Sequence, residues 1–192
     1  MDRPAPFPLP FEPRRLLLFS GHRIDAPQRS PARFPPQLEA PAAARIAAVL
    51  ASLAADSNDI GLTEGAAGGD LLFTEACLHR GVPVQLLLPM PEDAFIDSSI
   101  LTSADGEHWK RRYLALKAAL PWPPRVMPAT DADAFEACNR WLLDTALASG
   151  AALQLVCLWN GEGGDGPGGT AHMVHEVQRA GGAVQWIDIR SL

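Results

Sequence analysis

The sequence lacks the many cysteines of disulfide-rich proteins, the long apolar runs of membrane spans and the excess positive charge of nucleic-acid-binding proteins. It holds three cysteines, Cys77, Cys138 and Cys157, which are scattered through apolar surroundings. We therefore expect neither a disulfide framework nor a zinc site. The longest apolar runs have the length of a strand, which is too short to span a bilayer. The formal net charge of −6 argues against a nucleic-acid-binding surface as the main function.

The start of the chain also lacks the marks of secretion. Residues 1–13 are rich in proline but have neither the basic start nor the apolar core of a signal peptide. We expect them to form a tail or linker, followed by a single domain over residues 14–192, because a chain of this length suits one domain with a sizeable core. With its cysteines as reduced core residues, the protein is predicted to be cytoplasmic.

What the sequence does contain is an alternation of short apolar runs and helical patterns. The runs predicted to be strands are residues 14–20, 59–63, 83–88, 151–159 and 183–189. Helical periodicity marks residues 38–55, 71–80, 95–101, 107–120, 131–149 and 171–180, and a short edge strand is placed within 122–128. This alternation predicts an α/β protein with a three-layer Rossmann-like fold: a mainly parallel sheet of five or more strands with helices on both faces.

Two glycine-rich turns each follow a predicted strand and precede a predicted helix. Residues 161–170 (GEGGDGPGGT) form one of them, and residues 64–70 (EGAAGGD) form the other. Glycines let the backbone approach an anion, and the unpaired N–H groups of a helix start favour negative charge. Thr170 is predicted to be the N-cap of its helix, and Pro167 gives the loop one rigid point. The alternative is an ordinary flexible surface loop.

A third loop, residues 21–36, follows the first predicted strand and carries cationic side chains in an otherwise acidic protein. These are His22, Arg23, Arg29 and Arg33. Any single arginine here is most simply explained as solvated, but the group favours contact with an anion. Ligands of parallel sheets bind beyond the carboxyl ends of the strands, where the strand order reverses. A 3-2-1 order continued outward by the late strands would bring all three loops to one crevice.

These motifs together resemble the SLOG superfamily, which groups the LOG phosphoribohydrolases (often mislabelled lysine decarboxylases) with DNA-uptake proteins and sensors of nucleotide ligands. Residues 65–70 are similar to its Gly-Ala-x-Gly-x-Asp turn, residues 167–170 to its Pro-Gly-Gly-Thr turn, and residues 19–23 (FSGHR) fit its first strand and loop. The resemblance covers residues 14–190. It implies a nucleotide site formed by Ser20, Gly21, His22, Arg23, Gly65, Ala66, Gly68, Gly69, Asp70, Pro167, Gly168, Gly169 and Thr170.

One departure from the family affects the expected function. The LOG enzymes carry Pro-Gly-Gly-x-Gly-Thr-x-x-Glu, whereas this chain is one glycine step shorter and has Met173 three residues after Thr170. Glu176 is the only acid on the helix that follows. We therefore expect binding of a nucleotide or nucleotide derivative by a ligand-sensing domain. The alternative is a phosphoribohydrolase that cleaves the N-glycosidic bond of nucleoside 5′-monophosphates.

Hydrolysis would need a carboxylate and an acid beside the phosphate anchor. Glu176 and Asp70 are the candidate catalytic residues, and the carboxylates on offer are Asp70, Glu64, Asp165 and Glu176. Candidate acids or electrostatic partners are His22, Arg23, His172 and His175. Each has a simpler interpretation: Asp70 caps its helix, and Glu176 is solvated. His172 and His175 are spaced for a metal, but without a third ligand nearby we expect neutral histidines and no metal.

The partners expected from the sequence are few. A phosphorylated nucleotide is the expected ligand, with no cofactor, no nucleic acid and no membrane. The resemblance to the LOG proteins, which are commonly dimers, implies a homodimer, and the proline-rich start favours a fused or interacting effector domain. Trp159 either stacks on a base or fills the core.

Overall fold

The computed structural model describes residues 4–130, 133–162 and 169–192. Its six strands are β1 (Arg15–Gly21), β2 (Asp59–Thr63), β3 (Val84–Leu88), β4 (Arg125–Val126), β5 (Ala152–Trp159) and β6 (Ala183–Asp188). They form one sheet in the order β4-β3-β2-β1-β5-β6, and every neighbouring pair is parallel. This is the 3-2-1 order continued by the late strands, which the sequence left open, and β5 lies inside the sheet between β1 and β6.

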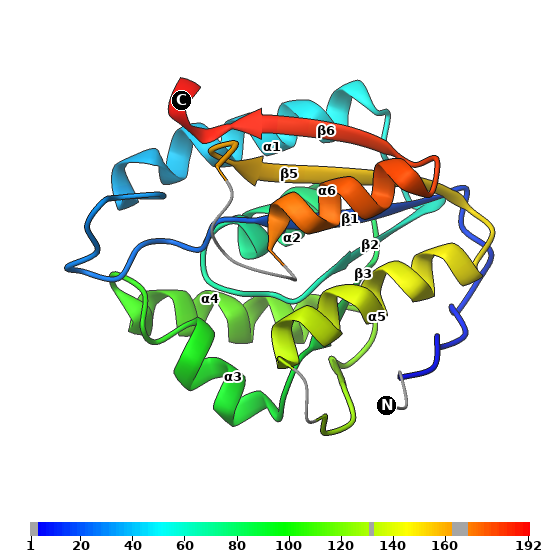
Figure 1. Cartoon of the computed structure of the whole chain (residues 1–192), viewed down its shortest axis with the longest axis horizontal. Coiled ribbons are helices and arrows are strands. Elements are labelled where there is room, and N and C mark those ends of the chain that lie inside the picture. Colours follow the sequence, from blue (N-terminus) through cyan, green and yellow to red (C-terminus); the bar gives the residue numbers. More distant parts are fainter. Residues whose placement is uncertain (1–3, 131–132, 163–168) are drawn as a thin grey trace.

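Helices cover both faces of this sheet. They are α1 (Glu39–Ser52), α2 (Gly69–His79), α3 (Glu92–Ser99), α4 (Gly106–Ala119), α5 (Ala134–Ala148) and α6 (Thr170–Arg179), with short 3-10 turns at Pro36–Leu38 and Ile189–Ser191. In Figure 1, α5 and α6 lie in front of the sheet, and α1, α2 and α4 lie behind it. No helix in the described part of the chain is long and apolar enough to cross a membrane.

Alternation along β1 divides the core between the two faces. Successive side chains of a strand point to opposite sides. Leu17 and Phe19 accordingly join the cluster that contains the buried residues of α1, α2 and α4, whereas Leu16 and Leu18 join the cluster with α5 and α6. Both faces are thus sealed by apolar side chains, which confirms the three-layer Rossmann-like architecture predicted from the continuous apolar runs.

The boundaries of the later elements differ slightly from the prediction. α5 begins at Ala134, with Asp133 as an N-cap whose side chain accepts a hydrogen bond from the Glu136 amide. The predicted start at residues 131 and 132 lies outside the described residues. The two-residue strand β4 is at the sheet edge, as its flanking prolines predicted.

All three cysteines are buried and free, and burial raises the pKa of the Cys157 thiol to about 12.

Part of the proline-rich start packs on the domain. The Phe7 ring meets Trp141 of α5 edge-on, with 5.6 Å between ring centroids. The Trp141 indole N–H donates to the Ala5 carbonyl at 3.0 Å, and the Arg125 guanidinium lies 4.2 Å from the centre of the Phe7 ring. These contacts seat residues 5–7 against α5 and β4.

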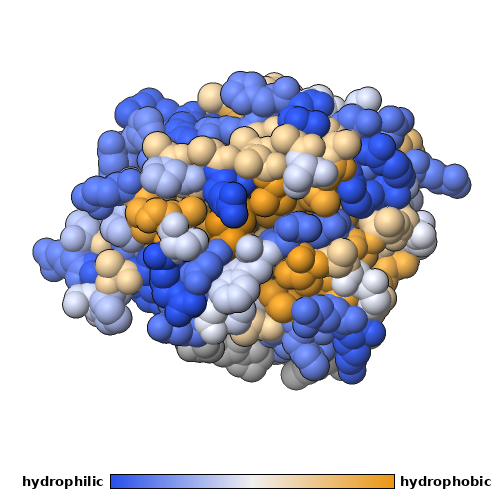
Figure 2. Space-filling view, turned by 90° about the horizontal axis from the view of Figure 1, so that it is seen from above, coloured by the Kyte–Doolittle hydropathy of each residue, from blue (hydrophilic) through white to orange (hydrophobic). Residues whose placement is uncertain are grey.

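At the opposite edge of the sheet, β6 presents an apolar surface. Trp186 is 52 % exposed, although its indole N–H donates to the Trp159 carbonyl at 2.9 Å. The two indole rings lie 5.9 Å apart. Figure 2 views the molecule from the β6 side and shows apolar patches among hydrophilic ones. Trp159 therefore packs against another tryptophan at the sheet edge.

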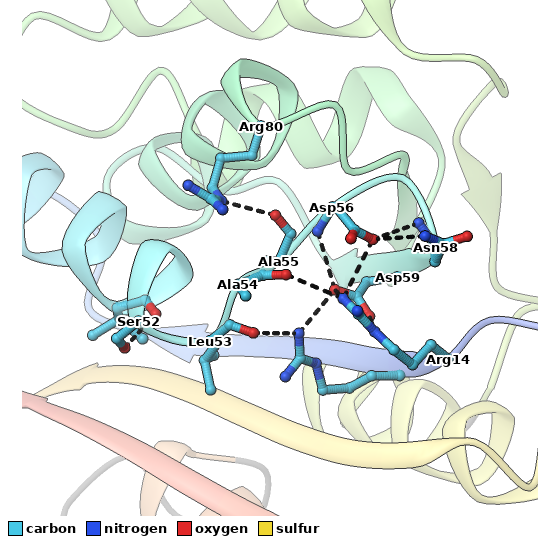
Figure 3. Close-up of polar contacts among 11 residues, drawn as sticks. Arg14, Ser52, Leu53, Ala54, Ala55, Asp56, Asn58, Asp59 and Arg80 are labelled. Atoms are coloured by element: carbon cyan, nitrogen blue, oxygen red, sulfur yellow. Dashed lines mark hydrogen bonds and ion pairs between the residues drawn. The ribbon is translucent and has the colours of Figure 1, made fainter.

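A buried carboxylate joins the amino ends of β1 and β2 (Figure 3). The Asp59 side chain is fully buried, and it accepts hydrogen bonds from Arg14 at 2.8 and 3.0 Å and from Arg15 at 2.9 Å. Burial by itself would raise the pKa of Asp59. The hydrogen bonds from Arg14, Arg15 and the Asp56 amide outweigh that effect, so the pKa lies below its ordinary value.

We expect Asp59→Asn to lower the free energy of unfolding by roughly 2–3 kcal/mol at pH 7, because both arginines lose their buried carboxylate. Since the folded pKa of Asp59 is lowered, its contribution is present at neutral pH and is lost as the pH falls through that pKa. Urea denaturation between pH 7 and pH 3 should therefore show the two proteins converging. Asp56→Asn, at an exposed ion pair, should cost less than about 1 kcal/mol. Equal costs for the two variants would contradict the role given to Asp59.

Candidate functional site

A pocket of about 390 Å³ lies at the carboxyl ends of the central strands, the end toward which the arrows point in Figure 1. Its lining includes Ser20, Gly21, His22, Arg23, Arg29 and Arg33 from β1 and its loop, Glu64, Ala66 and Asp70 after β2, Asp133, Phe135 and Asn139 around the start of α5, and Gly169 and Thr170 at the start of α6. This size is within the range of small-molecule sites. The three loops singled out in the sequence thus meet at one pocket.

The predicted ligand-binding residues divide into three groups. Those that line the pocket are Ser20, Gly21, His22, Arg23, Ala66, Asp70, Gly169 and Thr170. Gly65, Gly68 and Gly69 are not among the lining residues: the first two lie in the turn after β2, and Gly69 is the first residue of α2. Pro167 and Gly168, with the candidate carboxylate Asp165, lie outside the described residues.

Asp70 organises the turn after β2 instead of capping α2. The N-cap of α2 is Gly68, and no side chain caps the helix. Asp70 turns back, and its Oδ2 accepts the amides of Gly65 at 3.0 Å and Ala66 at 3.1 Å. Burial raises the pKa of Asp70 to about 6, against the lowering effect of these two amides. The sequence predicted that this turn approaches an anion, but two of its amides are hydrogen-bonded to a carboxylate of the chain itself.

Gly68 brings the same turn against the loop after β1. Its φ is +108°, and a Cβ at this position would lie 2.5 Å from the Ile24 nitrogen. The Ile24 amide donates to the Ala67 carbonyl at 3.0 Å, and the Gly69 amide donates to the His22 carbonyl at 3.2 Å. A positive φ combined with such a close backbone approach requires glycine. These contacts fix the backbone of the pocket wall.

Asp25, which the sequence analysis did not single out, shapes the arginine loop. Its Oδ2 accepts the amides of Arg33 at 2.9 Å and Phe34 at 3.0 Å, and its Oδ1 lies 3.4 Å from Nε of Arg29. Phe34 is fully buried and anchors the end of the loop. The loop is consequently folded around Asp25, which places Arg29 and Arg33 on the pocket.

The start of α6 adds positive potential to the pocket. Gly169 is the N-cap, so the prediction that Thr170 caps the helix is wrong; Thr170 is its first residue. Extended backbone at Gly169 leads directly into the helix, and the Thr170 hydroxyl lies 3.1 Å from the Ser20 hydroxyl, which joins α6 to the end of β1. The first N–H groups of a helix have no acceptor within it and carry the positive end of its dipole.

Glu64 is the acid of the pocket with an unsatisfied atom. Its Oε1 is buried and has no hydrogen-bond partner among the described residues. Burial, and next the charge of Asp70, raise the pKa of Glu64 well above its ordinary value, while the nearby Cys138 thiol and Arg23 guanidinium act in the opposite direction. Buried polar atoms are nearly always paired, so an unpaired one beside a pocket indicates a functional position.

Glu176 and the two histidines of α6 lie away from this pocket. Glu176 and His172 line a separate hollow of about 500 Å³ between α5 and α6. The Glu176 carboxylate accepts a hydrogen bond from Arg179 at 2.9 Å, and the exposed His175 ring lies 3.9 Å from it. Within the described residues, no group of three or more His, Cys, Asp or Glu side chains could hold a metal ion.

His22, the remaining candidate acid, lines the pocket, but its side chain is buried and already hydrogen-bonded. Its Nε2 accepts a hydrogen bond from the Asn160 amide at 3.3 Å. This contact joins the end of β1 to the residue that follows β5. Arg23, its neighbour, is exposed and donates to the Ser98 carbonyl at 2.8 Å.

The contribution of α5 to the pocket was missed in the sequence. Asp133, Phe135 and Asn139 lie at or near its start and close one side of the pocket. A signal was available, because a helix that follows a parallel strand begins at the carboxyl edge of the sheet. The strand before α5 is only two residues long, so the sequence marked that edge poorly.

The structure is that of a Rossmann-like α/β protein with a pocket at the carboxyl edge of its sheet. No protein-family model matches the sequence, and neither does any curated protein. Among solved structures, the chain is similar to one of DNA processing protein A from Streptococcus pneumoniae. The identity is 14 % and the TM-score is 0.43, with 89 % of this chain and 58 % of that chain covered. The likeness concerns the fold.

Gly68→Ala should destabilise the protein by about 1–3 kcal/mol more than Gly81→Ala, as measured by urea denaturation. Both glycines have a positive φ, but a Cβ at Gly81 would meet nothing within 4 Å, whereas at Gly68 it would collide with Ile24. The difference between the two variants combines the collision with the greater backbone strain at Gly68, whose φ of +108° and ψ of −125° lie outside the regions open to other residues. Equal losses would show that the turn does not depend on this close approach.

Proposed function

We propose that this chain binds a phosphorylated nucleotide or nucleotide derivative in the carboxyl-edge pocket and acts as a ligand-sensing domain. The observation that carries the proposal is the gathering of Arg23, Arg29 and Arg33 with the start of α6 around one pocket. The same lining carries Asp25, Glu64, Asp70 and Asp133, so the three arginines lie beside acidic groups. Arginine donors and helix N-termini are the groups that bind phosphate in proteins.

The phosphate is assigned to the start of α6. Of the two glycine turns, the one after β2 has the amides of Gly65 and Ala66 occupied by Asp70. At the other, Gly169 and Thr170 line the pocket at a helix start. A helix N-terminus contributes only about 0.3–1 kcal/mol toward a charged group, and more when it is partly buried. The arginine loop must therefore supply much of the affinity.

Hydrolysis of nucleoside 5′-monophosphates is the second candidate function. It is favoured by Glu64 and Asp70, two acids of the pocket lining whose pKa values are raised by burial, since a carboxyl with a raised pKa can serve as a general acid. Against it stand the position of Glu176 in a separate hollow and the engagement of His22 by the Asn160 amide. We therefore place binding first.

Gly169→Asp tests the phosphate site without destabilising α6. Aspartate is a favourable N-cap, so the helix should keep its stability, whereas the new carboxylate occupies the place of the anion. We expect the affinity for nucleoside mono-, di- or triphosphates, measured by calorimetry, to fall at least about tenfold, because like charges are brought together. Gly169→Asn has the same size and no charge, so it should lose much less. Wild-type affinity in Gly169→Asp would refute the phosphate site.

A thermal-shift screen of nucleotides identifies the ligand for the binding and base-release measurements. A ligand at a hundred times its dissociation constant adds about 2.7 kcal/mol of stability, which a thermal-shift assay detects readily. The same nucleotides are then assayed for release of the free base. We expect little or none, and no effect of Glu176→Gln on binding. Base release that collapses in Glu176→Gln would establish the hydrolase in place of the sensor.

A further inference from the structure

The pocket is lined by groups of both charges. Arg29, Arg33 and the start of α6 can meet an anion, whereas Glu64 and Asp70 are acids of the same lining. A ligand that carried only an anionic group would pair with the first set and leave Glu64 without a partner. Leaving a buried polar atom unsatisfied is unfavourable, so Glu64 indicates what else the ligand must offer.

Of the two acids, Glu64 is the one with an oxygen to spare. The Oδ2 atom of Asp70 is committed to the amides of Gly65 and Ala66, which hold the turn together. Oε1 of Glu64 is equally buried but has no partner in the described part of the chain. Glu64 is also the first residue after β2, so a rigid central strand sets its position.

An unpaired carboxyl oxygen calls for a hydrogen-bond donor on the ligand. In a nucleotide the donors closest to the phosphate are the ribose hydroxyls, and the amino groups of the bases are further away. In dinucleotide-binding folds, an acidic residue beyond the phosphate turn holds the ribose hydroxyls in the same way. A carboxyl oxygen accepts such a bond whether or not the other oxygen carries a proton.

We propose that Glu64 accepts a hydrogen bond from the ribose 2′-hydroxyl, so that the pocket selects ribonucleotides over 2′-deoxyribonucleotides. This inference rests on the proposed nucleotide function and deepens it by naming the class of sugar. Phosphate binding at α6 and sugar selection at Glu64 are then separate properties of one pocket, carried by different elements.

The test compares AMP with 2′-deoxy-AMP, and GMP with 2′-deoxy-GMP, by calorimetry on the whole chain. The wild type should bind each ribonucleotide about tenfold or more tightly than its deoxy partner, because a site built to pair a hydroxyl rejects the analogue that lacks it. Glu64→Ala should bring that ratio close to one while leaving the affinity for the deoxynucleotides nearly unchanged. Glu64→Gln keeps a carbonyl acceptor and should retain part of the preference.

Glu176→Ala is the matched control, since it removes an acid outside the pocket and should keep the wild-type ratio. Equal affinities for both sugars in the wild type would overturn the role of Glu64 and leave the nucleotide site standing. A loss in Glu64→Ala that depends on the base and not on the 2′-hydroxyl would overturn it as well. Failure of the wild type to bind any of the four nucleotides would refute the proposed function and this inference with it. The wild-type ratio decides the question even if Glu64→Ala does not fold.

Discussion

Backbone contact between the turn after β2 and the loop after β1 holds the pocket in shape. Ile24 donates to Ala67 and Gly69 donates to His22, and the absent side chain of Gly68 leaves the room for both bonds. The loop is long and polar, and this attachment adds to the hydrogen bonds of Asp25 and the buried Phe34, which also hold its conformation. With it, the rigidity of the two central strands extends to the arginines.

Glycine therefore has a different function at each of the two turns. After β2, the glycines permit two segments of the chain to approach each other, and Asp70 takes the amides they leave open. Before α6, Gly169 leads extended backbone into a helix whose first amides have no acceptor within it. The same residue type serves packing in one turn and exposes helix amides in the other. Only the second arrangement is suited to an anion.

The sequence predicted the sheet well because the determinants of the sheet are local. Continuous apolar runs such as residues 152–159 indicate strands buried on both faces, and the helices between them force parallel connections. The sequence could not predict which groups hydrogen-bond to the backbone amides of the glycine-rich turns. The partner of each amide is set by tertiary contacts, such as that of Asp70 with Gly65. The loop after β1 was recognised by its arginines, whereas Asp25, which folds it, carries no pattern of its own.

Helix geometry alone could have predicted on which side of α6 Glu176 lies relative to Thr170. Successive residues of an α-helix are separated by about 100°, so a residue three positions after Thr170 stays near its side of the helix, whereas one six positions later lies about 120° away from it. Met173 accordingly packs with the core beneath α6, and Glu176 faces the hollow beside α5. A loop shortened by one residue does not undo that rotation.

Charged groups at the two ends of the sheet show what separates a structural cluster from a binding site. At the amino ends, the buried Asp59 meets Arg14 and Arg15, and both of its oxygens have partners. At the carboxyl ends, Glu64 is partly buried, and its buried Oε1 has no partner among the described residues. The first arrangement stabilises the fold unaided. Under the proposed function, the second would be stabilised further when a ligand with a hydrogen-bond donor enters, so that its free energy would depend on the ligand, as a sensor requires.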